Sequence, residues 1–432
     1  MLSYLKRNIG PIAVILIFAL LFLGDVARIK PYDADNLIAL SFGKLSAANL
    51  FEGSFTNYLP AYRPLSKIAV YLQYQLGGVS QLQNFFWGNW LMWTGCAVGL
   101  YVLLENITTS RLASLLGAVG MLLDPRAIFA LVWIGERQNT ICLLAGLVAL
   151  YIAFTLNRKT DYKKILLINL FLFLSLLSKE FGLAFTIPVL LVVLRRTKNY
   201  LLALSVLFSF LFYMVARLTL GVSSNDINSF CETMGYFDKT LEICYSGMGI
   251  VGRIKQYLYN TGASFIGTFL PLFFSRVGTL SGINFTLGFY MNFAFSVLIL
   301  VPSIIALAKK YKDSTIFLLL IVLSAFANFI LFRERNQLIG MLGFYALFGI
   351  GLSQIFKKIK MKFIKVGIAY LIIISTLCLN GLDFRREIQY FVGTSEKNDP
   401  CRALEKYPQD IDKTIVQTVS NYYKLNLNCL NK

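Results

Sequence analysis

The sequence contains no histidine, and its 22 acidic residues are outnumbered by 41 lysines and arginines among 432 residues. Without histidine, the chain cannot build a Ser–His or Cys–His nucleophile or a histidine-ligated metal site. General acid and base chemistry must therefore come from Asp, Glu, Lys or Tyr. The sequence also lacks an internal repeat and a low-complexity tract, which argues against a transporter built from inverted halves.

Charge is scarce as well, since charged residues make up 15% of the chain while 57% is hydrophobic and the mean hydropathy is +0.64. This composition excludes a soluble globular domain. Apolar runs of roughly 17 to 25 residues recur, and each is long enough for a helix to cross a bilayer. The sequence therefore predicts an all-α polytopic membrane protein with about 11 transmembrane helices.

The excess of basic residues does not indicate nucleic acid, because most of them stand in short clusters between apolar runs. Such clusters mark cytoplasmic loops and contacts with membrane lipids. Lys6 and Arg7 place the N-terminus inside, and the clusters at 309–314 and 357–365 are expected inside too. Both clusters fit if the apolar piece at 257–274 is re-entrant or interfacial rather than a full span. The C-terminus then lies outside.

Two units are predicted along the chain. Residues 1–382 form a transmembrane catalytic unit with outer loops at 24–83 and 217–283, and the first of these loops is expected to form amphipathic helices on the outer face. Residues 383–432 form a small polar tail on the periplasmic side, which is too short for a sizeable core of its own.

Four of the seven cysteines lie in polar segments. If those segments face an oxidising compartment, two local disulfides are expected, Cys231 with Cys244 and Cys401 with Cys429. The other three cysteines lie in apolar runs, where a thiol behaves as a small hydrophobic group.

On this topology, polar clusters at the outer ends of helices converge on one face of the membrane. Ionisable residues beside hydrocarbon are costly, so they are usually paired or functional. The clusters are Asp33 to Asp35, Tyr62 to Leu65, Asp124 to Ala127, Glu136 to Asn139, Ser178 to Glu180 and Arg333 to Gln337.

Together these side chains suit the transfer of a sugar from a lipid phosphate. A carboxylate can take the proton of an incoming hydroxyl, while cations neutralise the charge that develops on a phosphate leaving group. Arginine suits the phosphate because its guanidinium is bidentate and always charged.

Each cluster also has a structural interpretation. Asp33 and Asp35 can cap the helix that begins near Asn36, because Asp is a preferred N-cap and favours the first turn. The other interpretations are Arg63 as an anchor to lipid phosphate, and Lys179 with Glu180 and Glu136 with Arg137 as structural ion pairs.

Several of these motifs resemble a known group. The two acids in the first outer loop resemble the modified DxD signature of GT-C glycosyltransferases. The ordered set is similar to the transmembrane part of the protein O-mannosyltransferases that carry tetratricopeptide repeats, and it consists of YRPL at 62–65, Asp124 with Pro125, Arg137, LLSKEFG at 176–182, RERN at 333–336 and GFYAL at 343–347. In size and architecture the chain also looks like bacterial O-antigen-modifying glucosyltransferases.

The resemblance implies a GT-C fold in which an outer-loop Asp is the base and the sugar carbon is inverted. It assigns the base to Asp33 or Asp35, the donor phosphate to Arg63, Lys179, Arg333 and Arg335, and supporting roles to Tyr62, Asp124, Arg137, Glu180 and Glu334. The chain departs from the family where Ala34 separates the acids and where Asp124 replaces the histidine of a His-Pro pair. Nor do tetratricopeptide repeats follow.

The predicted function is a membrane glycosyltransferase of the bacterial inner membrane with its active site on the periplasmic face. It would move a sugar from a polyprenyl-phosphate donor to a hydroxyl of a periplasmic or lipid-linked glycan, such as O-antigen or lipopolysaccharide. A metal-independent site is favoured, because two acids are a sparse ligand set for a divalent cation.

Three alternatives remain. One is a protein O-glycosyltransferase. The second is an O-antigen polymerase or ligase, against which the early position of the acidic pair argues. The third is a lipid-linked sugar flippase or transporter, against which the grouping of charges at helix ends argues.

Overall fold

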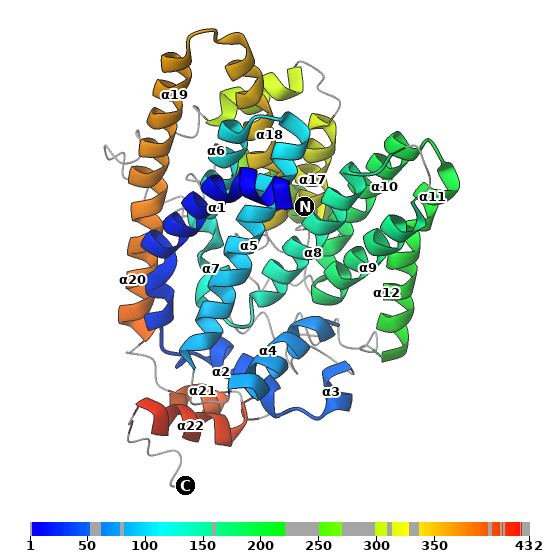
Figure 1. The fold of residues 1–432 in the computed structure, drawn as a ribbon. Helices are drawn as coiled ribbons and strands as arrows, with labels where there is room; N and C mark the ends of the chain where they lie inside the picture. The colour runs from blue at the N-terminus through cyan, green and yellow to red at the C-terminus, as the bar shows by residue number, and fades with distance from the viewer. Residues whose placement is uncertain are drawn as a thin grey trace.

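The computed structural model describes residues 2–51, 62–77, 82–157, 161–220, 250–269, 299–308, 313–327, 337–395, 400–406, 408, 411–423 and 425. In these ranges every regular element is a helix (Figure 1). The labelled helices are α1 (Leu2–Leu23), η1 (Gly24–Arg28), α2 (Ala34–Ser41), η2 (Phe42–Lys44), α3 (Ala47–Phe51), α4 (Pro64–Gly77), α5 (Gln83–Thr108), α6 (Arg111–Leu122), η4 (Pro125–Ala127), α7 (Ile128–Val132), α8 (Arg137–Phe154), α9 (Tyr162–Ser178), η5 (Glu180–Gly182), α10 (Leu183–Thr197), α11 (Tyr200–Ser205), α12 (Leu207–Leu220), α14 (Ile250–Phe269), α17 (Ser314–Ala327), α18 (Leu338–Lys358), α19 (Lys362–Ser375), η9 (Thr376–Gly381), α20 (Leu382–Ser395), α21 (Pro400–Lys406) and α22 (Lys413–Tyr423).

By length and composition, six helices of the described chain can cross a membrane, or seven if the bent pair α6 and α7 counts as one span. α9 and α10 have 17 and 15 residues and are shorter than these candidates. α14 is not among them either, although it packs against α17 and α18. The all-helical membrane fold is confirmed, while the count of about 11 spans remains a prediction.

The centre of the bundle is α18, which packs against α5, α6 and α17. Its apolar side chains are buried along almost the whole helix. Small residues let other helices approach it closely, since a Cβ atom added at Gly343 would lie 2.7 Å from the carbonyl oxygen of Phe317. In membrane helices, such close packing replaces the hydrophobic driving force that water would supply.

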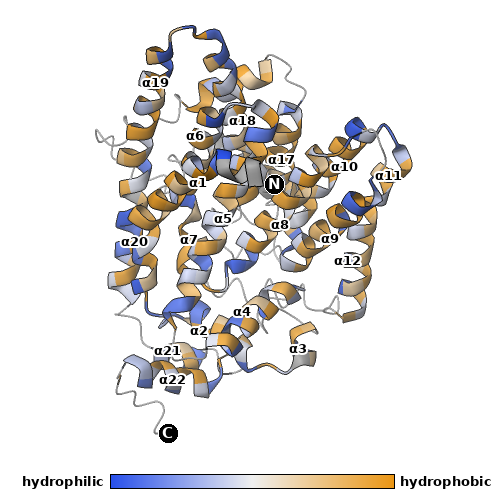
Figure 2. Ribbon diagram, viewed as in Figure 1, coloured by the Kyte–Doolittle hydropathy of each residue, from blue (hydrophilic) through white to orange (hydrophobic). Residues whose placement is uncertain are grey.

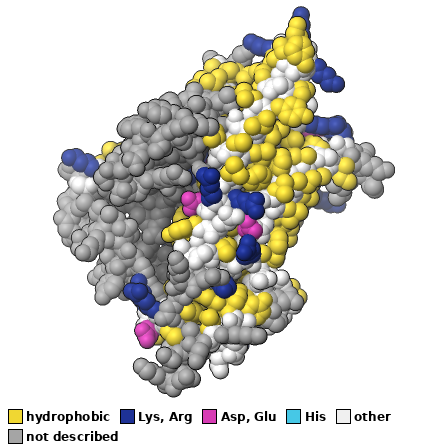
Figure 3. Space-filling view, turned by 90° about the vertical axis from the view of Figure 1, so that its left-hand side faces the viewer, with side chains coloured by type: hydrophobic (Ala, Val, Ile, Leu, Met, Phe, Trp, Pro, Cys, Tyr) yellow, Lys and Arg dark blue, Asp and Glu magenta, His cyan; other side chains and the backbone are white. Residues whose placement is uncertain are grey.

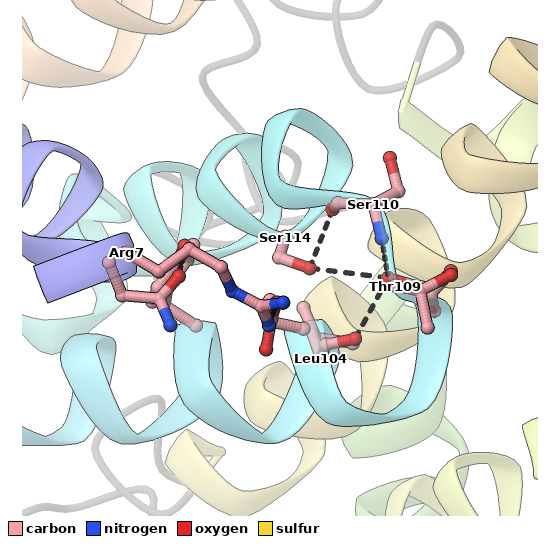
Figure 4. A network of polar contacts seen from close by, with 9 residues as sticks. Arg7, Leu104, Thr109, Ser110 and Ser114 are labelled. Carbon is pink, nitrogen blue, oxygen red and sulfur yellow. Dashed lines mark hydrogen bonds and ion pairs between the residues drawn. The ribbon is translucent and has the colours of Figure 1, made fainter. Parts of the chain in front are cut away.

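One end of the bundle is held by polar contacts between α1, α5 and α6 (Figure 4). Arg7 forms an ion pair with Glu105, with 2.5 Å between Nη2 and Oε1. α5 ends at Thr109, whose φ of 58° is left-handed and whose N–H donates to the Glu105 carbonyl. In the last turn of α5, the hydroxyl of Thr108 lies 3.3 Å from that of Ser114 on α6.

At the other end, α2, α4, α21 and α22 gather beneath the long helices (Figure 1). Figure 2 shows mixed polar and apolar residues on these short helices, whereas the long helices are mostly apolar. α2 packs against α4, α21 and α22, so the first outer loop and the C-terminal tail form one layer. The first loop forms the short helices α2, α3 and α4, and their place on the outer face of a membrane remains a prediction.

The last long helix continues past the predicted domain boundary at 382. α19, a π-helical turn (η9) and α20 follow one another without a break as far as Ser395. On the described part of this side, Figure 3 shows a long apolar band with a group of charged side chains beside its middle. At the end of α1, Asp25 accepts a hydrogen bond from Arg385 at 3.3 Å, which ties η1 to α20.

Candidate functional site

The acidic stretch of the first loop turns into α2 at Asp33. The backbone there is extended, with φ −78° and ψ 157°, and the carboxylate caps the helix. Its Oδ1 accepts a hydrogen bond from the backbone N–H of Asn36 at 2.9 Å, and its Oδ2 accepts one from the Asn36 side-chain amide at 2.7 Å. The capping interpretation is therefore confirmed for Asp33, while Asp35 lies exposed in the first turn.

The environment of Asp33 disfavours its charged form. Burial raises the pKa of this carboxyl to about 6, although the hydrogen bond from the Asn36 backbone works against the rise. The nearby charge of Asp35 raises the pKa further. A carboxyl whose pKa lies near 6 is well suited to act as a general base near neutral pH.

A second cluster forms where the beginning of α4 meets η5. Arg63 donates to both carboxylate oxygens of Glu180, from Nε at 3.0 Å and from Nη2 at 2.5 Å, and its Nη1 donates to Gln138 at 2.8 Å. Burial alone would raise the pKa of Glu180, but the charge and hydrogen bonds of Arg63 lower it to about 2. Beside this pair, the Tyr62 ring packs against that of Tyr213.

Lys179 lies next to this pair but bonds to a different residue. Its buried ammonium donates to Asn139 Oδ1 at 2.6 Å and lies 4.6 Å from the centre of the Phe181 ring. The Asn139 amide in turn donates to Glu136. Glu180 is thus bound by Arg63, which comes from a distant part of the chain. The sequence predicted an ion pair of Glu180 with Lys179 and did not predict Arg63 as a partner.

The predicted ion pair between Glu136 and Arg137 is wrong. The buried guanidinium of Arg137 donates instead to three neutral acceptors, Asn89 Oδ1 at 2.9 Å, Gln73 Oε1 at 2.6 Å and the Phe85 carbonyl at 2.7 Å. No carboxylate in the described ranges pairs with it. Arg137 therefore joins α4, α5 and α8.

Asp124 lies in the turn between α6 and η4 and is fully buried. Arg126 binds both of its oxygens, at 2.8 and 2.5 Å, and the Tyr345 hydroxyl donates to it at 2.9 Å. Pro125 explains the bend here, because a proline breaks the helical hydrogen bonding and keeps the residue before it extended. This ion pair holds the 50° bend between α6 and α7 against α18.

Other predicted site residues lie outside the described residues, and their roles remain predictions. They are Arg333, Glu334, Arg335, Cys231, Cys244 and Cys429. Cys401 is disulfide-bonded.

The sequence analysis gave no role to the amides that connect the predicted residues. Asn36, Asn89 and Asn139 are all buried and bond across the fold. Their sequence signal is a polar amide near the end of an apolar run. Lys67, one turn after Arg63 on α4, was also missed, and burial lowers its pKa to about 8.

In comparisons with known proteins, no family model and no curated protein matches the chain. Its fold does match solved structures. The Archaeoglobus fulgidus oligosaccharyltransferase, tethered to an acceptor peptide that contains the NVT sequon, superposes with a TM-score of 0.51 at 13% identity over 89% of this chain and 56% of its own.

A second structure is the oligosaccharyltransferase AglB from Archaeoglobus fulgidus in complex with an inhibitory peptide and a dolichol-phosphate. It superposes with a TM-score of 0.53 at 12% identity over the same shares of the two chains. The chain shares its fold with these two structures. It spans a little over half the length of these two structures. The closer resemblances named from the sequence remain predictions.

Proposed function

We propose that the chain is a GT-C membrane glycosyltransferase that takes its sugar from a polyprenyl-phosphate donor. The observation that carries this proposal is the oriented carboxylate of Asp33. Hydrogen bonds through Asn36 connect this carboxylate to the segment at 132–134, and the first turn of α8, which follows that segment, binds Arg63 and Lys179. The shared fold supports it, and so does the dolichol-phosphate named with one of the neighbours.

In the proposed reaction Asp33 is the base. It takes the proton of an acceptor hydroxyl as the hydroxyl oxygen attacks the anomeric carbon, while the bond from that carbon to the phosphate oxygen breaks. The electron pair leaves with the polyprenyl phosphate, and the configuration at carbon is inverted. We favour Asp33 over Asp35 because two hydrogen bonds fix the carboxylate of Asp33, whereas Asp35 is exposed.

The leaving phosphate needs positive charge, but in the described cluster the positive and negative charges nearly cancel. Glu180 neutralises Arg63, so a phosphate would have to share that guanidinium with the carboxylate. Lys179 supplies a second cation, held by a neutral amide. We therefore propose that Arg333 and Arg335 complete the phosphate site, which keeps the metal-independent interpretation.

The proposed acceptor is a hydroxyl of a periplasmic or lipid-linked glycan, such as O-antigen or lipopolysaccharide. On the proposed topology the site opens to the periplasm of a bacterial inner membrane. A protein hydroxyl is the other acceptor to assay, because one neighbour was studied with an acceptor peptide.

The test compares Asp33→Asn with Asp35→Asn in membranes supplied with a radiolabelled polyprenyl-phosphate sugar. Asn caps a helix about as well as Asp, so Asp33→Asn keeps the cap. It removes the base together with the oxygen that accepts from the Asn36 side chain. We expect transfer to fall roughly 100-fold or more in Asp33→Asn, the usual effect of losing a general base. Asp35→Asn should retain most of the activity.

The outcomes separate the capping role of Asp33 from its chemistry. Equal thermal stability of Asp33→Asn and wild type, together with lost transfer, supports the base. Full transfer by Asp33→Asn would overturn its assignment, and a wild-type protein that moves no sugar to either class of acceptor would overturn the function.

A further inference from the structure

A buried amide joins the two ends of the candidate site. Asn36 is fully buried, and its Nδ2 donates both to Asp33 Oδ2 at 2.7 Å and to the Val132 carbonyl at 3.3 Å. Its Oδ1 accepts the backbone N–H of Ile134 at 2.7 Å. Since Ile134 can only donate here, the amide orientation is fixed, and both of its N–H groups have acceptors.

The segment that Asn36 grips leads directly into the cation cluster. A second asparagine, Asn89 on α5, donates to the carbonyls of Leu131 and Trp133, which alternate with the two groups bound by Asn36. The segment is thus held by amides from two helices. The first turn of α8, which follows it, supplies Gln138 to Arg63 and Asn139 to Lys179.

We propose that Asn36 is a positioning residue for this transferase: its amide aims the Asp33 carboxylate and keeps it in register with the residues that hold Arg63 and Lys179. This inference deepens the proposed function and rests on it. α2 also packs on the segment directly, because a Cβ added at Gly135 would lie 3.8 Å from Ala39 and from the Asp35 carbonyl. Asn36 adds hydrogen bonds to that packing.

Asn36→Asp tests the role with an isosteric side chain. The variant keeps an acceptor for Ile134 but loses the donor to Asp33 and adds a like charge beside it. Both changes disfavour the ionised form of Asp33, so its titration should move to higher pH by about one unit or more. The matched control is Asn89→Asp, which weakens the hold on the same segment without touching Asp33.

The readout is the pH dependence of carbodiimide labelling at Asp33 in the purified full-length protein, located by peptide fragmentation. Carbodiimide reacts with the protonated carboxyl, so the midpoint reports the ionisation of Asp33 without any substrate. The charged residues on α2, on the helices packed against it and at Glu136 beside Gly135 stay the same in every variant. They are Asp35, Lys44, Lys67, Glu136, Arg402, Glu405, Lys406 and Lys413.

We expect the midpoint to rise in Asn36→Asp and to stay at the wild-type value in Asn89→Asp, with the acidic limb of the transfer rate moving in step. An unchanged midpoint in Asn36→Asp, or equal shifts in both variants, would overturn the inference. If Asn36→Asp does not fold, Asn36→Ala should also raise the midpoint, because it loses the same donor, and no rise would count against the role. Failure of the wild type to transfer sugar would contradict the proposed function separately.

Discussion

Arg63 and Glu180 meet across 117 positions of the chain, and their pairing decides how the basic side of the site behaves. Two parallel hydrogen bonds fix the guanidinium as well as neutralising it. An arginine held in this way is an ordered donor rather than a mobile cation, which suits recognition of a phosphate in one orientation. Through this ion pair, Glu180 also contributes to the stability of the folded protein.

Glu180 should make stability depend on acid pH. Its pKa in the folded protein is about 2, below the ordinary value of 4.5, so its contribution is complete above about pH 4.5 and is lost as the pH falls through about 2. Glu180→Gln should remove this part of the pH dependence. At pH 7 it should also lower the free energy of unfolding by about 1–3 kcal/mol, because Arg63 stays buried without its carboxylate.

Thermal unfolding in detergent between pH 7 and pH 2.5 measures both effects. The exposed Glu387→Gln is the control and should follow the wild type. Parallel curves for Glu180→Gln and wild type would show that the ion pair does not contribute.

At this scale the charged residues were predictable and their partners were not. Arg63, Lys179 and Glu180 stand out because charge is rare near apolar runs. The choice of Arg63 over Lys179 as the partner of Glu180 depends on how α4 and η5 meet, which no local pattern contains. The role of Asn36 was not predicted because its partners Val132 and Ile134 lie almost 100 positions away in the chain.

At the scale of elements, the C-terminal tail braces the acidic loop. The Asp412 N–H donates to the Ser41 hydroxyl at 3.0 Å at the end of α2, and the rings of Tyr32 and Tyr423 pack edge to face at 5.3 Å. The sequence predicted this tail as a small unit of its own. Its polar composition gives no information on which part of the protein it packs against. In the structure α21 and α22 complete the layer that holds α2.

The disulfide of Cys401 should therefore matter for α2. Cys401→Ser frees one end of α21, and losing a native disulfide typically costs about 2 kcal/mol or more. We expect amide hydrogen exchange in α2 to speed up roughly 30-fold, which corresponds to about 2 kcal/mol. Cys378→Ser, at a free cysteine, is the control and should leave α2 protected. Unchanged exchange in Cys401→Ser would mean that α21 stays docked without the bridge.

For the whole molecule, the apolar runs and basic clusters were enough to predict a helical membrane protein. The apolar run at 338–355 forms α18, because an uninterrupted apolar run leaves no other structure in lipid. The bend between α6 and α7 was not predictable in the same way. Asp124 is buried there because Arg126 and the Tyr345 hydroxyl donate hydrogen bonds to its carboxylate inside the bundle. No local sequence pattern indicates Tyr345 as a partner.

The two ends of the bundle should face opposite sides of the membrane. The α18–α19 turn at the top of Figure 1 is rich in lysine, whereas α2 and α22 form the opposite end. The positive-inside rule then places Lys360 in the cytoplasm and Lys413 outside, with the candidate site on the outer end. Both lysines are exposed, so cysteines at these positions should be reactive.

Labelling of intact cells with a membrane-impermeant maleimide measures this orientation. Lys413→Cys and Lys360→Cys are made separately in a Cys378→Ser background, which serves as the blank. Lys413→Cys should label in intact cells, and Lys360→Cys should label only after lysis, because the bilayer separates the two ends. The reverse pattern would put the candidate site in the cytoplasm, where a lipid-linked periplasmic donor could not reach Asp33, and the proposed function would fail with it.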